Sequence, residues 1–318
     1  MDVSQLDIVK QRRVRMLETA LGPDIMHYLQ DEDTVEVMLN PDGRLFYEQM
    51  GVGKKATDII IPPEQSENIV KLVASFKNKV ADDAQPDVAG DLPFEGARFQ
   101  GWLPPVVSQP CFAIRRRARK IFTLDDYQKQ GAITEKQVTY LQKAVKQRKN
   151  IIIVGGTGSG KTTFANALLA LLSGANDRIL VIEDLPELQV DVPDLVTMTT
   201  TLDVSMRDLV KGSLRMRPDR IIIGEVRDGS ALELLKAWNT GHPGGLCTIH
   251  ANSAESAPYR VEDLLQEVVA SVPHTLIVQS IDILVFIQRD KTGKRQISQM
   301  LELISYENGA YQFQPCLD

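Results

Sequence analysis

A glycine-rich segment between a strand-forming run and a helix-forming run constrains the fold of this chain most strongly. The apolar run Ile151–Val154 leads into residues 155–163, which read Gly-Gly-Thr-Gly-Ser-Gly-Lys-Thr-Thr and fit the pattern G-x-x-x-x-G-K-S/T. A helix-forming run, residues 164–172, follows at once. Glycines let the backbone turn its N–H groups inward, and the start of the helix adds its dipole. The segment therefore predicts a phosphate-binding loop.

Two side chains of the loop have the chemistry that a phosphate chain requires. Lys161 can reach the outer phosphates, and the Thr162 hydroxyl can complete a Mg²⁺ shell. We therefore expect a nucleoside triphosphate, with ATP and Mg²⁺ as the cofactors. The predicted nucleotide-binding residues of the loop are Gly155, Gly156, Thr157, Gly158, Ser159, Gly160, Lys161, Thr162 and Thr163.

Strand-forming and helix-forming runs alternate through the rest of the C-terminal half. Further apolar runs occur at residues 178–182, 220–223, 246–249 and 282–287. Fully apolar strands between helices indicate a sheet covered on both faces, hence an α/β fold with a RecA-like P-loop ATPase core. Turn sequences at residues 291–294 and 307–310 indicate hairpins near the end of the chain.

A smaller α+β domain is expected before this core. Its evidence is a helical pattern over residues 5–30, a strand–turn–strand pattern over 34–48, a helix over 67–76 and a strand over 111–114. A length of 318 residues suits two domains. We place the N-terminal domain at 1–121, a linker at 122–132 and the ATPase domain at 133–318. Thr123 or Asp125 is expected to cap the helix that follows.

Three of the predicted strands are followed by residues that carry chemistry. Glu183 and Asp184 follow the second strand of the core, Glu225 follows the third, and His250 follows the fourth. Strand ends in an open α/β sheet face the ligand crevice, where carboxylates can hold Mg²⁺ or its waters, or orient the attacking water. His250 could bond a phosphate, a carboxylate or a neighbouring subunit, and it could equally be a structural residue.

Gly224 departs from a common pattern, because many P-loop ATPases carry an aspartate there that contacts the metal shell. The metal shell is therefore expected to depend on Thr162, phosphate oxygens, water, and Glu183 or Asp184. Glu225 keeps the position of a carboxylate that activates water.

Basic residues of the N-terminal half leave two alternatives open. Arg98 and Arg115 occur in strand-like segments and suit bidentate phosphate contacts, but both could be surface cations. Residues 11–15 form a basic helix face that is either solvated or in contact with an anionic membrane. Residues 116–120 are expected to be a solvated basic run.

Composition excludes several classes of protein. A net charge of −6 argues against a dedicated nucleic-acid binder. The three cysteines are far apart, which excludes a disulfide framework or zinc module and indicates a reducing compartment. The N-terminus is not a signal peptide, and no apolar run reaches the ~18 residues that a membrane span needs.

Four segments taken together resemble the traffic ATPases of type II and type IV secretion. Residues 155–163, 182–188, 214–227 and 241–252 resemble the Walker A segment, acidic box, Walker B segment and histidine box of that family. The chain lacks the four-cysteine module of type II secretion ATPases and an evident signature of retraction motors. Within the family it most resembles the ATPases of conjugative transfer.

The resemblance implies a cytoplasmic homohexamer at the inner membrane, with peripheral membrane contact. It would power pilus assembly or substrate passage with other inner-membrane and cytoplasmic components, and its N-terminal domains would move within the ring. Direct sequence-specific nucleic-acid binding is not expected. Two alternatives remain: a nucleotide-dependent docking switch with slow hydrolysis, and a nucleic-acid helicase on the same core.

The resemblance also implies roles for individual residues. Glu225 would be the catalytic carboxylate, Glu183 would assist the metal or water, and His250 would couple nucleotide state to conformation. Arg98 and Arg115 would reach the phosphates from the N-terminal domain. Arg215 or Arg227 would act across a subunit boundary.

Overall fold

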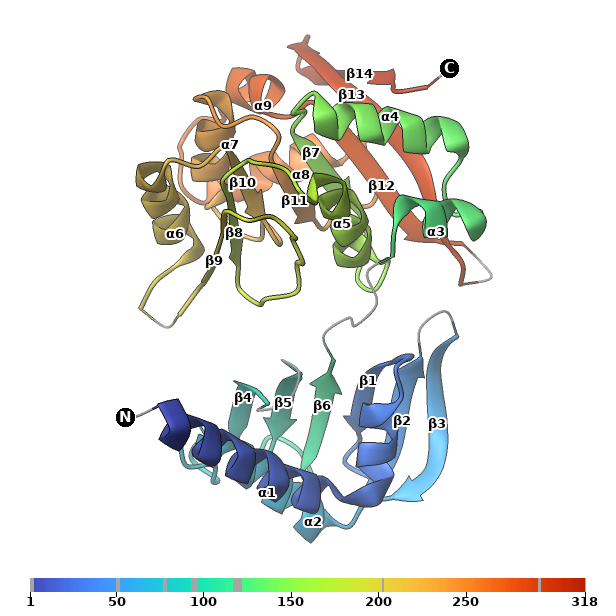
Figure 1. Ribbon diagram of the computed structural model, residues 1–318, viewed down its shortest axis with the longest axis vertical. Helices are drawn as coiled ribbons and strands as arrows, with labels where there is room; N and C mark the ends of the chain where they lie inside the picture. The colour runs from blue at the N-terminus through green and yellow to red at the C-terminus, as the bar shows by residue number, and fades with distance from the viewer. Residues whose placement is uncertain are drawn as a thin grey trace. The chain divides into compact units, whose positions relative to one another are not determined.

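The computed structural model describes residues 3–49, 52–76, 79–92, 97–116, 122–201, 203–290 and 293–317. The chain forms two compact units, Met1–Arg119 and Lys120–Asp318. Figure 1 labels the elements of each unit. The first unit contains α1 (Val3–Gln30), β1 (Thr34–Leu39), β2 (Arg44–Gln49), β3 (Gly53–Ile60), α2 (Pro63–Phe76), β4 (Asp87–Asp91), β5 (Arg98–Trp102) and β6 (Cys111–Arg115).

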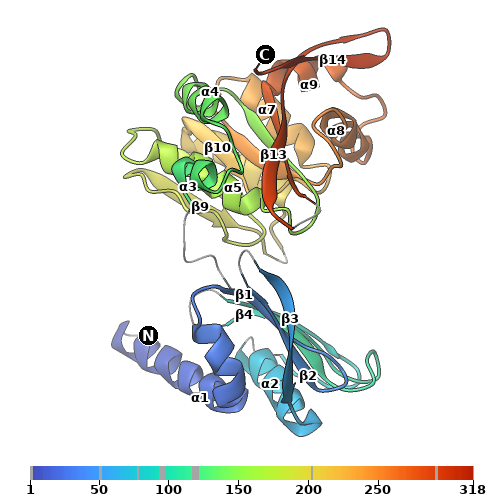
Figure 2. The ribbon, with the colours of Figure 1, turned by 90° about the vertical axis from the view of Figure 1, so that its right-hand side faces the viewer.

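The first unit is a sheet with helices on one face. Its six strands run in the order β3-β2-β1-β6-β5-β4, and each paired strand is antiparallel to its neighbour. Both α1 and α2 lie on the same side of this sheet (Figures 1 and 2). Alternate strand residues such as Val37, Phe99 and Ile114 are buried beneath the helices. The predicted strands and helices of this unit are confirmed.

One helix of this unit departs from the regular pattern. Gly22 has a φ of 72° inside α1, and Pro23 follows it. Pro23 has no N–H, and the turn at Gly22 frees carbonyls of the preceding turn. The Gln65 side chain of α2 donates to two of them, Ala20 O at 3.0 Å and Leu21 O at 3.2 Å. The interruption in α1 is thereby used to join the two helices.

The described residues of the second unit form a series of helices and strands in chain order. They are α3 (Leu124–Lys129), α4 (Glu135–Lys146), β7 (Ile151–Val154), α5 (Lys161–Leu169), η1 (Ala170–Leu172), β8 (Ile179–Glu183), β9 (Leu195–Thr199), α6 (Met206–Ser213), η2 (Leu214–Met216), β10 (Arg220–Ile223), α7 (Ala231–Asn239), β11 (Leu246–Ile249), α8 (Ala257–Gln266), α9 (His274–Ser280), β12 (Ile283–Arg289), β13 (Arg295–Glu307) and β14 (Ala310–Pro315).

The sheet of the second unit has the order β14-β13-β12-β7-β11-β10-β8-β9. The six strands from β12 to β9 are parallel, and β13 and β14 add an antiparallel edge. Helices α3 to α5 cover one face and α6 to α9 cover the other. The predicted α/β class with a RecA-like core is confirmed. β9 was not predicted, because its sequence, Leu-Val-Thr-Met-Thr, is only half apolar.

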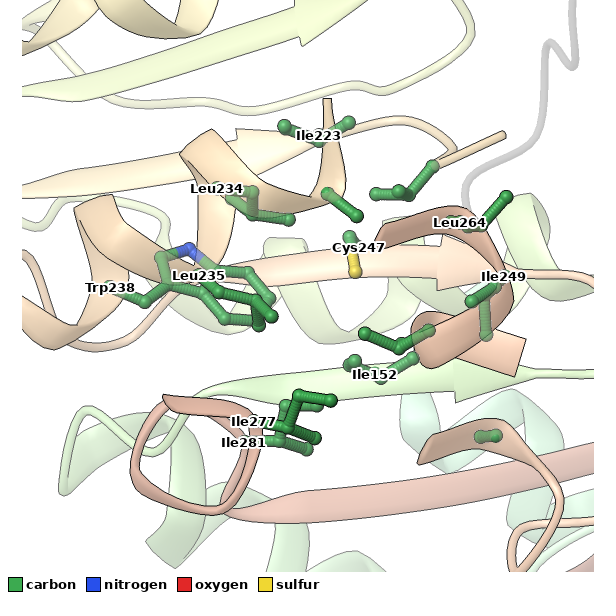
Figure 3. Close-up of a cluster of buried hydrophobic side chains, with 14 of the residues drawn as sticks. Ile152, Ile223, Leu234, Leu235, Trp238, Cys247, Ile249, Leu264, Ile277 and Ile281 are labelled. Carbon is green, nitrogen blue, oxygen red and sulfur yellow. The ribbon is translucent and has the colours of Figure 1, made fainter. Parts of the chain in front are cut away.

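Strand β7 lies in the middle of the sheet and contributes to both cores. Ile151 and Ile153 belong to the core beneath α3, α4 and α5, while Ile152 and Val154 belong to the opposite core. Figure 3 shows the second of these cores around Cys247 of β11. All four β7 side chains are buried, and each contributes ~1.5–3 kcal/mol to the free energy of unfolding. This packing holds the end of β7, where the glycine-rich loop begins.

The segment expected to be a linker differs from that expectation. Residues 124–129 form α3, which Thr123 caps through a capping box with Asp126. Leu124 and Tyr127 are buried in the core with Phe164 of α5, and the Tyr127 and Phe164 rings meet edge to face at 5.1 Å. The segment is therefore packed into the second unit. Its single turn of apolar residues was too short for the helical pattern to stand out.

Other observations correct or limit the sequence predictions. Arg116, expected to be solvated, is buried, and its guanidinium donates to the carbonyls of Asp31 and Thr34. Residues 117–120 of the same basic run lie outside the described residues. No helix within the described part of the chain is long and apolar enough to cross a membrane.

Candidate active site

The glycine-rich loop joins β7 to α5, as the sequence predicted. Gly158 and Gly160 have φ angles of 69° and 98°, a region that favours glycine. Gly155 is restricted by space, because a Cβ there would lie 2.4 Å from the Ile287 carbonyl oxygen. Gly158 and Gly160 are therefore required by the backbone conformation, and Gly155 by the lack of space for a side chain. Lys161 begins α5 directly after Gly160.

The Lys161 ammonium group lies within the loop and beside His250. Its side chain is buried, and Nζ donates to Gly156 O at 3.1 Å. Nζ also lies 3.2 Å from His250 Nδ1. His250 follows β11, the direct neighbour of β7 in the sheet. The strand order thus brings together two residues that are 89 positions apart.

His250 connects Lys161 to the predicted catalytic carboxylate. Its Nε2 lies 2.8 Å from Glu225 Oε1. Burial lowers the pKa of His250, the nearby charge of Lys161 lowers it further, and Glu225 opposes this effect. Lys161 Nζ also lies 3.3 Å from His250 Nε2, so the ammonium group approaches both ring nitrogens. The loop lysine and Glu225 are therefore bridged by one ring.

Arg227 pairs with carboxylates of the same unit. Its Nη2 donates to Glu225 Oε2 at 2.6 Å, and its Nη1 lies 3.9 Å from Asp184 Oδ2. The hydrogen bond to Glu225 raises the pKa of Arg227. Thr200 donates to Asp184 at 3.0 Å. The carboxylates after β8 and β10 are thereby linked, as their strands are neighbours.

Glu183 explains why glycine stands at position 224. The Glu183 side chain is buried, and its Oε1 accepts from the backbone N–H groups of Glu187 and Leu188, both at 2.9 Å. A Cβ on Gly224 would lie 2.9 Å from Glu183 Cγ and 3.1 Å from its Oε1. The glutamate of β8 fills the space that a side chain at 224 would need. An aspartate at 224 and this position of Glu183 are therefore mutually exclusive.

The donor set fits a magnesium ion that arrives with a nucleotide. Thr162 and Glu183 offer oxygen ligands, and Mg²⁺ prefers oxygen and keeps several waters. Among the residues that the structure describes, no group of three or more His, Cys, Asp and Glu side chains could hold a metal ion by itself.

A cleft of about 550 Å³ opens beside the loop. Its lining joins two loop residues to the histidine box and to α8: Gly156, Thr157, His250, Ala251, Asn252, Ser256, Tyr259, Arg260 and Asp263. The contributions of Tyr259, Arg260 and Asp263 were not predicted, because they belong to no motif. Arg260 contributes to the lowered pKa of His250.

The other predicted arginines belong to other elements of the two units. Arg98 and Arg115 are paired across β5 and β6 of the first unit. They belong to a charged row that takes one residue from each strand: Lys54, Glu48, Glu36, Arg115, Arg98 and Asp91. Burial raises the pKa of Glu36, and the charge of Arg115 opposes that rise. Arg215 is exposed on η2 of the second unit.

Comparison with known proteins adds independent evidence. The chain is 45% identical over 303 residues to the conjugal transfer protein TrbB of Rhizobium radiobacter, covering 95% of this chain and 93% of that one. It is 32% identical over 295 residues to the type IV secretion system protein VirB11 of Bartonella quintana, covering 80% and 82%. The fold is similar to that of the Legionella pneumophila ATPase DotB, with a TM-score of 0.63, 17% identity and coverage of 90% and 80%.

A family match agrees with these relatives. Residues 97–304 match the family described as type II/IV secretion system protein. That range includes the glycine-rich loop, Glu183, Glu225 and His250. The resemblance inferred from four short segments is confirmed, and the chain belongs to the type II/IV secretion system protein family.

Proposed function

We propose that this chain is the ATP-hydrolysing motor of a type IV secretion system used for conjugal transfer. One observation carries the proposal: Lys161, His250 and Glu225 meet at the ends of three adjacent parallel strands, β7, β11 and β10. Its relative TrbB, which is 45% identical, supports the assignment to conjugal transfer. The substrate would be ATP with Mg²⁺.

The contacts of Lys161 suggest how nucleotide would enter. In the structure its ammonium group is held by Gly156 O and His250. A phosphate chain is a stronger partner for this cation than a carbonyl or a neutral ring. Lys161 would therefore leave His250, while loop N–H groups and Thr163 bind the phosphates. Mg²⁺ bound with the nucleotide would be held by Thr162 and, through water, by Glu183, and would neutralise phosphate charge.

Glu225 would orient the attacking water and accept its proton. Phosphoryl transfer depends mainly on positioning and charge neutralisation, so a carboxylate held by Arg227 and adjacent to His250 suits this role. His250 touches both Lys161 and Glu225, so departure of Lys161 would change the charge that Glu225 faces. That contact is the basis for proposing that His250 couples nucleotide state to conformation.

The remaining roles follow from the family. Arg98 and Arg115 of the N-terminal domain (1–121) would reach the phosphates, and Arg215 would act from a neighbouring subunit. Arg227 is a weaker choice for a trans role, since it pairs with Glu225 of its own site. The assembly would be a cytoplasmic homohexamer at the inner membrane, bound to other components of the secretion complex. Turnover in domain 133–318 would move the N-terminal domains within the ring.

The test is phosphate release from Mg²⁺ and ATP by the wild type, Lys161→Ala and Glu225→Gln, with membranes present and absent. Nucleotide binding and mass by light scattering are measured in parallel. We expect the wild type to turn over and to reach a six-subunit mass. Glu225→Gln should bind nucleotide and lose hydrolysis by about 100-fold or more, and Lys161→Ala should lose binding.

Three outcomes would change the proposal. Wild-type phosphate release no greater than that of Lys161→Ala would remove the enzyme assignment. Normal hydrolysis by Glu225→Gln would move the catalytic role to another carboxylate, with Glu183 first. Tight binding and very slow turnover, with nucleotide-dependent capture of secretion components, would favour a docking switch.

A further inference from the structure

Two arginines of the β12–β13 hairpin lie against the glycine-rich loop. Arg289 is the last residue of β12 and Arg295 is the first of β13, and the strand register pairs them directly. They are about 130 positions after the loop in sequence, and no motif includes them. Like charges at directly opposed positions are unfavourable in an antiparallel pair. Both side chains lie at the same end of the hairpin, and each approaches the loop.

Arg289 makes a direct hydrogen bond to the loop. Its Nε donates to Gly158 O at 2.9 Å. The carbonyl of Gly158 and the N–H of Ser159 belong to one planar trans peptide unit, so they point in opposite directions. Holding the carbonyl therefore also orients the Ser159 N–H, which donates to Gly156 O at 3.3 Å inside the loop. The hydrogen bond from Arg289 thus fixes the orientation of the peptide unit between Gly158 and Ser159.

Arg295 contacts the next glycine of the loop. A Cβ on Gly160 would lie 2.8 Å from Arg295 Nε and 2.9 Å from its Cδ. The arginine side chain therefore packs over the backbone at the start of α5, directly before Lys161. This close packing gives a reason, besides the φ of 98°, for glycine at position 160.

The acidic group of the same hairpin has a backbone partner. Asp290 Oδ1 accepts from the backbone N–H of Lys294 at 2.9 Å, which closes the hairpin turn. Lys294 itself approaches a different element: its Nζ would lie 3.3 Å from a Cβ on Gly131, after α3. Arg289 and Arg295 thus lie against the glycine-rich loop, while Lys294 of the same hairpin lies near Gly131.

We propose that Arg289 is a positioning residue for the phosphate-binding loop, with Arg295 as its second contact. The hairpin holds the loop backbone in one conformation and adds positive charge beside the place proposed for an anionic polyphosphate. This inference rests on the proposed nucleotide binding, and it assigns no catalytic step to either arginine.

The experiment compares Arg289→Gln, Arg289→Lys and Arg295→Gln with Lys294→Gln. The last variant removes the same charge from the same hairpin without touching the loop. The dissociation constant for Mg²⁺–ATP is measured by calorimetry, with kcat, KM and the melting temperature of the protein without nucleotide. Arg289→Gln should weaken binding and raise KM by about tenfold, with kcat changed less than threefold and the melting temperature close to that of Lys294→Gln.

Conservative replacement separates positioning from bulk charge. Arg289→Lys keeps a donor that can reach Gly158 O, so it should recover at least half of the lost binding free energy. Arg295→Gln should weaken ATP binding by a smaller factor than Arg289→Gln. Binding by Arg289→Gln within twofold of the wild type, or an equal loss in Lys294→Gln, would overturn the inference.

The two proposals fail in different ways. If the wild type binds ATP but does not hydrolyse it, the motor function fails. The dissociation constants of the variants still test the positioning role of Arg289. If the wild type hydrolyses ATP and Arg289→Gln matches it, only the role of Arg289 is lost. If Arg289→Gln does not fold, Arg289→Lys and Arg295→Gln decide by the same binding measurement. If the wild type binds no ATP, both proposals are withdrawn.

Discussion

At the scale of single residues, the Glu183 side chain occupies the volume that any side chain at position 224 would need. A Cβ on Gly224 would lie closer to Glu183 Cγ, at 2.9 Å, than non-bonded carbons normally approach. Glu183 cannot move away easily, because two backbone N–H groups hold its Oε1. The glycine is thus required by the buried glutamate.

We expect Gly224→Ala to lower the free energy of unfolding by about 1–3 kcal/mol, through overpacking against Glu183. Phosphate release should fall as well, because Glu183 would be displaced. Chemical denaturation and turnover assays measure the two effects. Gly212→Ala is the control: its Cβ would meet nothing within 4 Å, and it lies in α6. This control should gain about 0.5–1 kcal/mol. Equal stability of Gly224→Ala and the wild type would contradict the packing argument.

The pKa of His250 is also set by the groups around it. Burial and Lys161 hold it below the ordinary value. In Lys161→Met the nearby positive charge is lost, so the pKa of His250 should rise toward its ordinary value. NMR titration of the imidazole signals measures it, with His250→Gln identifying the resonance and Lys294→Met as control. An unchanged pKa in Lys161→Met would mean that Lys161 is not beside the ring in solution.

The same shift has a consequence for stability. A folded-state pKa below that of the unfolded chain means that the unfolded state binds more protons between the two values. The free energy of unfolding should therefore decrease as the pH falls from about 6.5, the unfolded pKa of histidine, toward the lowered folded pKa. His250→Gln should show a smaller decrease over this interval, measured by denaturation at a series of pH values.

At the scale of elements, Gln65 joins α1 to α2. Its side-chain amide donates to the Ala20 and Leu21 carbonyls, directly before the Gly22–Pro23 interruption of α1. Leu17, Leu21 and Ile25 of α1 are fully buried on the same face. The helix therefore bends at a defined place while keeping its apolar side on the sheet.

We expect Gln65→Ala to destabilise the first unit by about 1–2 kcal/mol, because the partly buried Ala20 and Leu21 carbonyls lose this donor. Asn68→Ala is the control, because Asn68 lies one turn along α2 and its side chain is exposed. Calorimetry of both variants should show a lower first-unit melting temperature for Gln65→Ala alone. A similar decrease in Asn68→Ala would indicate a general helix effect instead.

At the scale of the whole molecule, each unit has its own hydrophobic core. Independent cores predict two unfolding transitions in calorimetry, of which Gln65→Ala identifies the one that belongs to the first unit. Mg²⁺–ADP at 100 times its dissociation constant should stabilise the second unit by about 2.7 kcal/mol. Lys161→Ala should abolish this shift.

The first-unit transition then tests Arg98 and Arg115. If these arginines bind the phosphates, nucleotide should stabilise the first unit too, and Arg98→Gln or Arg115→Gln should remove that effect. A nucleotide shift confined to the second unit would leave both arginines with the charged row of their own sheet. An equal shift in Lys161→Ala and the wild type would mean that the nucleotide binds elsewhere.

Sequence by itself determined the elements that depend on local patterns. Strands β7, β8, β10, β11 and β12 were predicted because fully apolar runs are characteristic of a sheet covered on both faces. The glycine-rich loop was predicted because phosphate binding needs fixed spacing of glycines, lysine and threonine. Glu183, Glu225 and His250 were predicted as site residues because each lies at the end of such a strand or just after it. All of these signals lie within a few neighbouring residues.

Tertiary structure decided which of these residues meet. The order β7-β11-β10 is a property of strand pairing between distant segments, and it places His250 between Lys161 and Glu225. The contact of Arg289 with Gly158 depends on a hairpin that returns to the loop 131 residues later. Packing of Glu183 against Gly224 depends on two adjacent strands. Such contacts have no local sequence pattern, because they arise only when separate elements share a core.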